Sequence, residues 1–371
     1  MSFMNHKEVL ITFLTIFIFS NSFAQKDEDF SQLKLNEIQI IGSHNSYKKA
    51  IHPKLWQLIE LFNSDLAYSL QYEHISLTEQ LTLGLRNLEV DVVYDPEGGR
   101  FQDPLGNTLL NIFLSEPIIY DTNKELSKPG LKVMHQPDFD FRSHNLTFID
   151  CLTEIKKWSD GNKIHIPIII TMNTKDSKQN IPGTVDLLPF TRDALNTIDD
   201  EILSVFNKDE LITPDLIQDK FKTLEEAILT NGWPIIEKLK GRILFVLDEQ
   251  GEKLDDYLND DKSLTNKVMF TNSEEGNPSA AFRIINDPIK DQEHIKELVK
   301  KGYIVRTRAD AGTKEARTHD YNRFEIAKSS GAQIITTDYY IPSKLFHSSF
   351  QVIFEDGKYI RTNKKNNSVN K

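Results

Sequence analysis

The chain has 371 residues, of which 39% are hydrophobic and 27% are charged, and its formal net charge is −11. This composition is typical of a globular protein that can bury a large core, and the length fits one barrel domain or two smaller domains. The negative charge excludes proteins that hold nucleic acid mainly through its phosphates. We therefore expect no nucleic-acid partner, and we expect a monomer.

The N-terminal residues have the pattern of a secretory signal peptide. A positive charge at Lys7 precedes the apolar run 9–19, and small residues surround a cleavage point after Ala24. The run is short for a membrane span, which needs roughly 20 apolar residues, although an uncleaved anchor is the alternative. No cysteine follows the run, so a lipoprotein anchor is not expected. We predict a signal peptide over 1–24 and a secreted or periplasmic mature protein.

Short β-rich runs recur along the rest of the chain, mostly with helix-like stretches between them. The predicted strands are 37–41, 87–94, 131–135, 164–173, 242–247, 267–271, 303–308 and 332–337. The predicted helices are 77–83, 146–158, 191–206, 223–229 with 234–240, 252–258, 291–301 and 319–329. Two long segments, 46–74 and 95–130, interrupt the alternation and are predicted as an insertion and a loop that shape the substrate site.

This alternation indicates a parallel sheet, and eight such units that close on themselves form a (β/α)₈ TIM barrel. An open doubly wound sheet is the alternative, but it needs a glycine-rich phosphate loop after the first strand, and 42–45 is not one. We predict a single barrel over 25–361 and a polar, disordered tail over 362–371. Catalytic groups of a barrel lie at the C-terminal ends of its strands, so polar residues there are the candidates.

Two carboxylates in the second predicted strand give the sharpest signal. Glu89 and Asp91 are two residues apart, so they share one face of the strand, and their neighbours are apolar. Two adjacent carboxylates repel each other, and a divalent cation removes that cost. Oxygen ligands from Glu89, Asp91, Asn45 and Asn173 favour a hard ion, Ca²⁺ or Mg²⁺, over zinc.

Two histidines lie at predicted strand ends on either side of these carboxylates. His44 follows the first predicted strand and His135 ends the third. Cleavage of a phosphodiester requires one proton to be taken from the attacking hydroxyl and another to be given to the leaving oxygen. Histidine performs both steps near neutral pH, so we predict that His44 and His135 are catalytic.

Basic side chains at strand ends are candidates for binding a phosphate. Arg306 and Arg308 lie on one face of the seventh predicted strand, and arginine can bind a phosphate through two parallel hydrogen bonds. Each arginine could instead form an ion pair with a nearby aspartate. Lys175 is also a candidate, although Lys175 or Arg86 could simply neutralise the two carboxylates.

Several of these residues lie in motifs of a known family. Ser43-His44-Asn45-Ser46-Tyr47, Leu88-Glu89-Val90-Asp91 and the later His135 resemble the catalytic core of phosphoinositide-specific phospholipase C. Further blocks resemble the bacterial Ca²⁺-dependent phosphatidylinositol phospholipase C group. These blocks are 94–100, 135–140, 305–311, 330–333 and 337–339. The bacterial resemblance spans nearly the whole mature chain and implies the fold of a PLC-like phosphodiesterase, a TIM barrel.

The resemblance also implies an activity. The chain would be a phosphoric diester hydrolase that cleaves phosphatidylinositol to diacylglycerol and a cyclic inositol phosphate. His44 would stabilise the pentacoordinate phosphorane, and His135 would protonate the diacylglycerol oxygen. Glu89 would help to deprotonate the inositol 2-hydroxyl. The substrate partner would be a phospholipid or a soluble inositol phosphodiester, and transient contact with a membrane surface is expected.

The resemblance further implies the binding residues. Asn45, Glu89 and Asp91 would bind Ca²⁺, with Mg²⁺ the second choice. The residues expected to contact the substrate are Lys175, Arg306, Arg308 and Tyr339.

One position departs from the family pattern. The family usually has a glutamate where this chain has Asn173, in the run Asn173-Thr174-Lys175-Asp176. An asparagine can still offer a carbonyl oxygen to a cation, but the site loses one negative charge. Ca²⁺ affinity follows the charge of the ligands, so we expect weaker binding of Ca²⁺ than in a site with the glutamate.

Two other functions remain open at this point. A glycerophosphodiester phosphodiesterase-like hydrolase uses the same barrel, but that family typically begins its motif with His-Arg, whereas Asn45 follows His44 here. The other is a secreted inositol-phosphate or lipid binding protein without turnover, which the change at Asn173 keeps open and the presence of both His44 and His135 disfavours.

Overall fold

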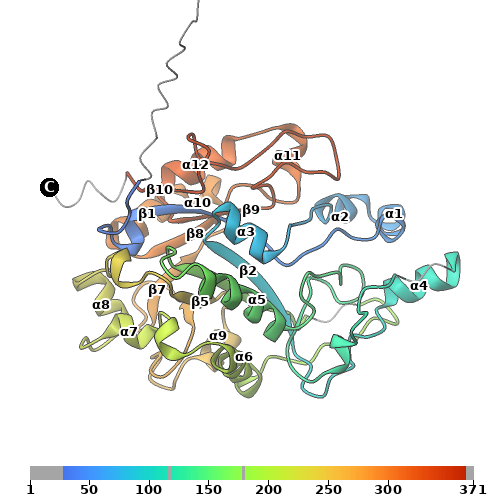
Figure 1. The fold of residues 1–371 in the computed structure, drawn as a ribbon, viewed down its shortest axis with the longest axis horizontal. Helices are drawn as coiled ribbons and strands as arrows, with labels where there is room; N and C mark the ends of the chain where they lie inside the picture. The colour runs from blue at the N-terminus through green and yellow to red at the C-terminus, as the bar shows by residue number, and fades with distance from the viewer. Residues whose placement is uncertain (1–27, 116–117, 178–179, 365–371) are drawn as a thin grey trace, which may run out of the picture.

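The computed structural model describes residues 28–115, 118–177 and 180–364, and its centre is a closed (β/α)₈ barrel (Figure 1). Eight parallel strands form the barrel. They are β1 (Ile38–Ser43), β2 (Asn87–Val93), β4 (Ile168–Thr174), β5 (Ile243–Leu247), β6 (Phe270–Asn272), β7 (Ala280–Ile284), β8 (Ile304–Arg308) and β9 (Ile334–Thr337). The predicted fold class is therefore confirmed.

The barrel closes where β1 meets β2. Gly42 pairs with Asn87 at this junction, and β1 pairs with β9 on its other side. A Cβ atom on Gly42 would lie 2.4 Å from Oδ1 of Asn87, so only glycine allows the two strands to approach this closely. The barrel strands are mostly buried on both faces, and the sequences of β4 and β5 are nearly continuously apolar, as this burial requires.

Two of the ten strands lie outside the parallel barrel. β3 (Lys132–Val133) pairs antiparallel with β2, and β10 (Ile360–Thr362) pairs antiparallel with β1. The prediction that 131–135 forms a barrel strand is therefore wrong. Its alternating pattern is that of a strand, but the chain turns back at Gly130 and runs against β2.

The barrel strand that takes the place of 131–135 among the eight is β7, and it was not predicted from the sequence. No helix separates β6 from β7: the intervening chain is a short polar segment rich in turns. The alternation of strands and helices therefore gives no signal for β7.

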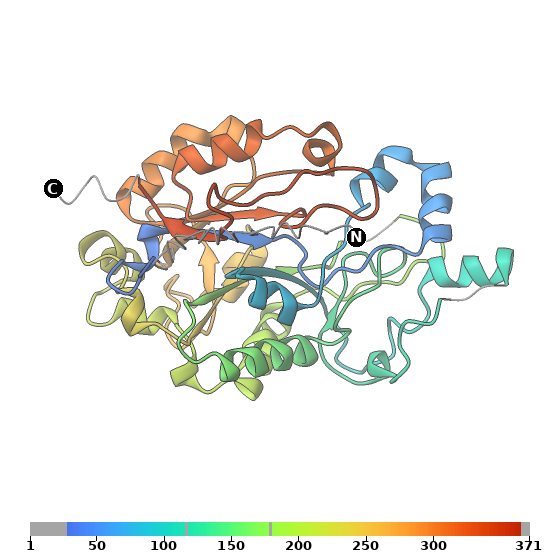
Figure 2. The ribbon, with the colours of Figure 1, turned by 45° about the horizontal axis from the view of Figure 1, so that its top comes forward.

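Helices surround the barrel and cover its outer face (Figure 2). They are α3 (Leu77–Leu83), α5 (Phe148–Gly161), α6 (Arg192–Val205), α7 (Pro214–Gln218), α8 (Leu224–Thr230), α9 (Glu252–Tyr257), α10 (Pro288–Lys301), α11 (Lys314–Thr318) and α12 (Asn322–Ser330). Short 3₁₀ helices occur at Leu35–Glu37, Glu125–Ser127, Lys208–Glu210 and Ile236–Lys238. The predicted helix at 234–240 is only the 3₁₀ turn Ile236–Lys238.

The two long segments predicted to lack barrel elements contain three further helices. α1 (Pro53–Phe62) and α2 (Ser64–Ser69) lie in the first segment, and α4 (Leu105–Leu114) lies in the second. Figures 1 and 2 show the three helices together at one end of the molecule, beside the barrel. We call them the helical cap. The cap has a small apolar core of its own, which includes Leu55, Ile59 and Leu110.

The ends of the chain fix the limits of the described fold. Thr362 is the last residue of β10 and Asn363 is buried, so ordered structure continues into the predicted tail, which was expected to begin at 362. The predicted signal peptide and residues 365–371 lie outside the described residues. Within the part of the chain that the structure describes, no helix has the length and apolar character needed to cross a membrane.

Candidate active site

The loop after β1 is held against β2 by paired hydrogen bonds. The backbone N–H of Ser46 donates to the carbonyl of Glu89 at 2.9 Å, and Oγ of Ser46 accepts from the N–H of Glu89 at 2.7 Å. Asn45, at the tip, has a left-handed backbone with φ of 48°, which asparagine tolerates better than most residues. The loop therefore fixes His44 and Asn45 beside the end of β2.

The two carboxylates of β2 are buried and lie at this loop. Asp91 accepts a hydrogen bond from the Tyr47 hydroxyl at 2.9 Å, and its Oδ2 lies 3.1 Å from Nζ of Lys175. Oε1 of Glu89 accepts from Nδ2 of Asn173 at 3.1 Å and lies 3.8 Å from Nε2 of His44. The structure thus brings the predicted acids together with both predicted amide residues and with Lys175.

Two oxygen atoms in this cluster are well suited to a hard cation. Oδ1 of Asn45 and Oδ1 of Asp91 are both buried and have no hydrogen-bond partner. Unpaired buried acceptors are rare because they lose their hydrogen bonds to water without replacement. A bound Ca²⁺ would satisfy both atoms, so the residues present fit the ion that the sequence indicated.

This cation site differs from one built of many acids. Among residues 28–115, 118–177 and 180–364, no three His, Cys, Asp or Glu side chains converge as a metal-binding group. Only Glu89 and Asp91 supply charge here, since the other candidate ligands, Asn45 and Asn173, are amides.

Positive charge already lies next to the two acids. Arg306, on β8, contacts Glu89 and the side chain of Asn286, and Lys175 pairs with Asp91. The side chains of Arg306 and Glu89 are only 3% and 5% exposed. The predicted alternative of an ion pair from Lys175 or Arg86 is therefore present at Asp91, through Lys175. Glu89 pairs with Arg306 instead, and Arg86 bonds to the backbone at Leu81.

The imidazole of His44 lies between the carboxylate of Asp338 and the guanidinium of Arg308. Its Nδ1 is 2.9 Å from Oδ1 of Asp338, which follows β9, and 3.3 Å from a guanidinium nitrogen of Arg308. Burial, together with the charge of Arg308, lowers the pKa of His44 well below its usual value. The imidazole is therefore neutral at neutral pH. With its proton on Nδ1 toward Asp338, the lone pair on Nε2 faces Glu89.

His135 has a carboxylate partner of its own. Its Nδ1 lies 2.9 Å from Oδ2 of Asp140, and Oδ1 of Asp140 lies 3.3 Å from Nζ of Lys48. The amine of Lys48 also donates to the carbonyls of Leu70 and Tyr72, so it is held in place while fully buried. This chain of contacts fixes the orientation of the His135 ring and leaves its Nε2 free to face a substrate.

A further buried carboxylate lies behind His44. The side chain of Asp310 accepts hydrogen bonds from the Thr337 hydroxyl and from the N–H of Asp338. Burial, with the negative charge of Asp338, raises the pKa of Asp310 to about 7. Asp310 thus holds the segment that carries Asp338, the partner of His44, and its backbone carbonyl accepts from Arg308.

Tyr339 does not lie among the other predicted substrate-binding residues. Its side chain is buried and packs against Phe346 and Phe350, in a cluster behind β9. The side chain of Asp338 reaches His44 from the bend that follows β9, whereas that of Tyr339 packs into the apolar cluster. The prediction that Tyr339 contacts the substrate is not supported by this placement, whereas Lys175, Arg306 and Arg308 all lie at the site.

Sequence analysis missed the carboxylate partners of the two histidines. Asp140 reaches His135 because the chain turns at Gln136, whose carbonyl accepts from the N–H of Asp140 at 2.8 Å. A His followed by an acid five residues later, with a proline between them, is a weak signal of such a turn. Asp338 was considered only as a partner for the arginines.

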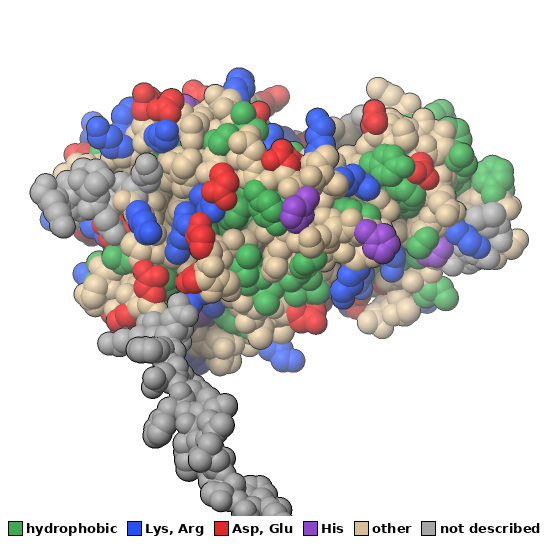
Figure 3. All heavy atoms as spheres, turned by 90° about the horizontal axis from the view of Figure 1, so that it is seen from above, with side chains coloured by type: hydrophobic (Ala, Val, Ile, Leu, Met, Phe, Trp, Pro, Cys, Tyr) green, Lys and Arg blue, Asp and Glu red, His purple; other side chains and the backbone are tan. Residues whose placement is uncertain are grey.

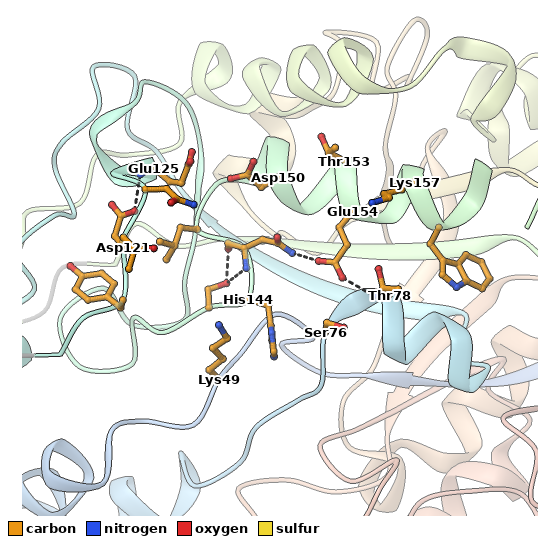
Figure 4. Close-up of a pocket in the computed structure, with 17 residues that line it drawn as sticks. Lys49, Ser76, Thr78, Asp121, Glu125, His144, Asp150, Thr153, Glu154 and Lys157 are labelled. Carbon is orange, nitrogen blue, oxygen red and sulfur yellow. Dashed lines mark hydrogen bonds between the residues drawn. The ribbon is translucent and has the colours of Figure 1, made fainter. Parts of the chain in front are cut away.

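Two cavities lie near this region, and only one touches the candidate residues. An apolar cavity of about 900 Å³ extends from His135 and Lys175 under the helical cap. A polar cavity of about 820 Å³ lies on the outside of the barrel between α3 and α5 (Figure 4). In that polar cavity, Glu154 already accepts from Thr78 and Asn145, and none of the predicted site residues lines it.

Comparisons with known proteins give the family and the fold of this chain. Residues 33–364 match the family described as phosphoinositide phospholipase C, Ca²⁺-dependent. The structure is similar to the calcium-dependent phosphoinositol-specific phospholipase C of a Pseudomonas species, with 15% identity, a TM-score of 0.54, and 90% of this chain and 96% of that chain covered. It is also similar to the Ca²⁺-dependent phosphatidylinositol-specific phospholipase C of Streptomyces antibioticus, with 15% identity, a TM-score of 0.51, and coverage of 86% and 99%.

A sequence comparison with curated proteins gives no match. The likeness to the two solved structures shows a shared fold, and the family match extends over most of the chain. The chain therefore belongs to the Ca²⁺-dependent phosphoinositide phospholipase C family.

Proposed function

We propose that this enzyme cleaves phosphatidylinositol by intramolecular attack of the inositol 2-hydroxyl on phosphorus. The P–O bond to diacylglycerol breaks, and the products are diacylglycerol and a cyclic inositol phosphate. One observation carries the proposal: two histidines are each oriented by a buried carboxylate of their own. His44 lies beside Glu89, and His135 lines the same cavity as Lys175, the partner of Asp91.

The two histidines divide the proton transfers. His44 is neutral, and its Nε2 lone pair faces the same space as Glu89, so it accepts the proton of the attacking hydroxyl with help from Glu89. Asp338 then stabilises the imidazolium, which in turn stabilises the charge of the phosphorane. His135 donates a proton to the leaving glycerol oxygen, and Asp140 stabilises the charged ring before that step.

The remaining polar residues of the site bind the phosphoryl group and the cation. Arg308 lies within 3.4 Å of the His44 ring and can donate to a phosphoryl oxygen at that place. Lys175, which pairs with Asp91, lines the cavity next to His135 and can bind the phosphate from that side. Asn45, Glu89, Asp91 and Asn173 hold Ca²⁺ in this proposal. When bound, Ca²⁺ supplies Lewis-acid stabilisation of negative charge on the phosphoryl group and on the attacking oxygen.

The role of His135 can be tested with the leaving group. A His135→Ala variant should lose roughly 10²- to 10⁴-fold in kcat on phosphatidylinositol, the usual contribution of a general acid. The same variant should lose far less on an inositol phosphate ester of nitrophenol, because that leaving group needs no proton. A His144→Ala variant is a matched control, since His144 lines the polar cavity outside the barrel. Equal losses on both substrates would exclude the acid role.

We also propose the wider organisation from the sequence pattern. Residues 1–24 would be removed on export, and the mature enzyme would be a secreted or periplasmic monomer with one catalytic domain. The apolar run 9–19 and the family match over 33–364 support this organisation. N-terminal sequencing of the exported protein and its mass in solution would test it.

A further inference from the structure

The apolar cavity under the helical cap has no role in the reaction described so far. Its walls come from all three cap helices and from two loops, and they are mostly aliphatic or aromatic. They include Leu58, Ile59, Leu66, Leu109, Pro137 and Phe139. Ile59 and its neighbour Leu55 also belong to the core of the cap, so these walls are part of a packed structure.

Polar groups also line this cavity, and two of them belong to the candidate active site. His135 and Lys175 line it, together with Thr174, Ser177 and Asn180. His135 is the group that faces the leaving oxygen in the proposed reaction, and Lys175 pairs with Asp91 of the cation site. The cavity therefore includes the histidine assigned to the leaving oxygen, and most of its other lining residues are apolar.

We propose that this cavity binds an acyl chain of the lipid substrate, next to the scissile bond. This inference rests on the proposed function and names the part of the substrate that the barrel residues do not contact. A ligand with an anionic end and an apolar tail fits a cavity that is lined by His135 and Lys175 and otherwise mostly by aliphatic and aromatic side chains. The volume of about 900 Å³ lies within the range of known small-molecule sites, roughly 300–1,000 Å³.

The surface of the cap fits a substrate that arrives from an apolar phase. Leu61 and Phe62 at the end of α1 are 84% and 85% exposed, and Ile112 and Phe113 on α4 are 67% and 70% exposed. Figure 3 shows hydrophobic side chains gathered at the end of the molecule where the cap lies in Figure 1. Phe62 also lines the cavity, so the exposed apolar surface is continuous with its interior.

The first experiment measures kcat/KM on dispersed substrates of increasing chain length. Glycerophosphoinositol and phosphatidylinositols with butanoyl, hexanoyl and octanoyl chains are used, each below the concentration at which it aggregates, with saturating Ca²⁺. Burial of each added methylene should raise kcat/KM by about two- to fourfold until the cavity is full. Equal kcat/KM values for all chain lengths would overturn the cavity proposal and leave the proposed function intact.

The second experiment fills the cavity. Leu109→Trp and, separately, Leu58→Trp should reduce the octanoyl-to-butanoyl ratio of kcat/KM by about tenfold or more, because the larger side chain occupies the space of several methylenes. Ile112→Trp is the matched control, since it makes the same helix larger at an exposed position outside the cavity and should keep the ratio. Circular dichroism confirms that each variant is folded.

The remaining outcomes are also decisive. If the ratio is unchanged in both filled variants but falls in Ile112→Trp, the chains bind the outer surface of the cap and the cavity proposal is wrong. If no diester is cleaved at all, the proposed function fails, and calorimetric titration with dioctanoylglycerol decides the cavity by itself. Binding that is lost in Leu109→Trp supports it, and no binding to the unmodified protein contradicts it.

Discussion

The guanidinium of Arg306 lies against the carboxylate of Glu89 inside the barrel, and both side chains are almost fully buried. Glu89 is also one of the two acids at the candidate cation site, next to the unpaired oxygen atoms of Asn45 and Asp91. A bound Ca²⁺ must therefore share Glu89 with a fixed positive charge. This relationship gives a direct test of how the site is built.

Removal of the charge of Arg306 should strengthen Ca²⁺ binding. In Arg306→Gln, the repulsion between the guanidinium and the ion is lost, so the affinity measured by calorimetry should rise on the order of tenfold. The free variant should be less stable than the unmodified protein, because Glu89 is left buried without its partner, and Ca²⁺ should raise its Tm by more. Arg283→Gln, on the neighbouring strand β7, should bind Ca²⁺ like the unmodified protein. Weaker binding in Arg306→Gln would mean that Arg306 supports the ion site.

The amide at position 173 should limit Ca²⁺ affinity. Asn173→Glu adds a negative charge beside Glu89, so Ca²⁺ should bind roughly tenfold or more tightly in a titration at fixed ionic strength. Without Ca²⁺ the same variant should have a lower Tm, because the two carboxylates repel each other. Asn173→Gln lengthens the side chain without adding charge and should show neither effect. An affinity that is unchanged or lower in Asn173→Glu would contradict the assignment of this residue to the site.

Asp140 should support catalysis because its carboxylate orients the ring of His135. Asp140→Asn should lower kcat on phosphatidylinositol by roughly 10- to 100-fold with little change in KM, as for other groups that orient a catalytic histidine. The loss should be much smaller with a nitrophenol leaving group. Asp138→Asn is the control, because Asp138 bonds to the backbone of Leu105 and Val185 and not to a histidine. A similar loss on both substrates would mean that Asp140 acts only on the fold.

One half-buried acid, Glu201, should make stability depend on pH. Glu201 accepts a hydrogen bond from the N–H of Leu131, its Oε2 has no partner, and burial raises its pKa to about 7. The unfolded chain releases this proton near pH 4.5. Between pH 4.5 and about 7, the folded state keeps this proton and the unfolded state loses it, so the free energy of unfolding falls progressively as the pH rises. Above about pH 7 the carboxyl is ionised in both states, and the loss of stability is complete.

Glu201→Gln removes this cost. The variant should be more stable than the unmodified protein by up to about 2 kcal/mol at pH 8, and the difference should vanish below about pH 4.5. Urea denaturation at both pH values measures the difference. A stabilisation that is the same at both pH values would show that the titration of Glu201 is not its cause.

The fold could be predicted where burial on both faces gives an unmistakable strand, as in β4 and β5. It could not be predicted where a strand follows another without a helix, as in β7, or where an alternating run pairs outside the barrel, as in β3. The cap helices were missed because they interrupt the alternation on which the barrel argument depends.

The residues of the candidate site also divide into those that the local sequence predicts and those that depend on the folded chain. Glu89 and Asp91 could be found because their spacing on one strand is a local property. The partners of His44 and His135 depend on which loops meet in space: Asp338 is 294 residues from His44 and joins it only because β1 and β9 are neighbours in the closed barrel. Tyr339 was assigned to the substrate by resemblance, and its direction depends on how the chain bends after β9.

The most direct test of the proposed reaction is phosphorus NMR of purified residues 25–371 with phosphatidylinositol vesicles, first with Ca²⁺ and then with excess chelator. The proposal predicts the signal of a cyclic inositol phosphate that appears with Ca²⁺ and stops growing when the chelator is added. No phosphorus product with Ca²⁺, from phosphatidylinositol or from glycerophosphoinositol, would contradict it.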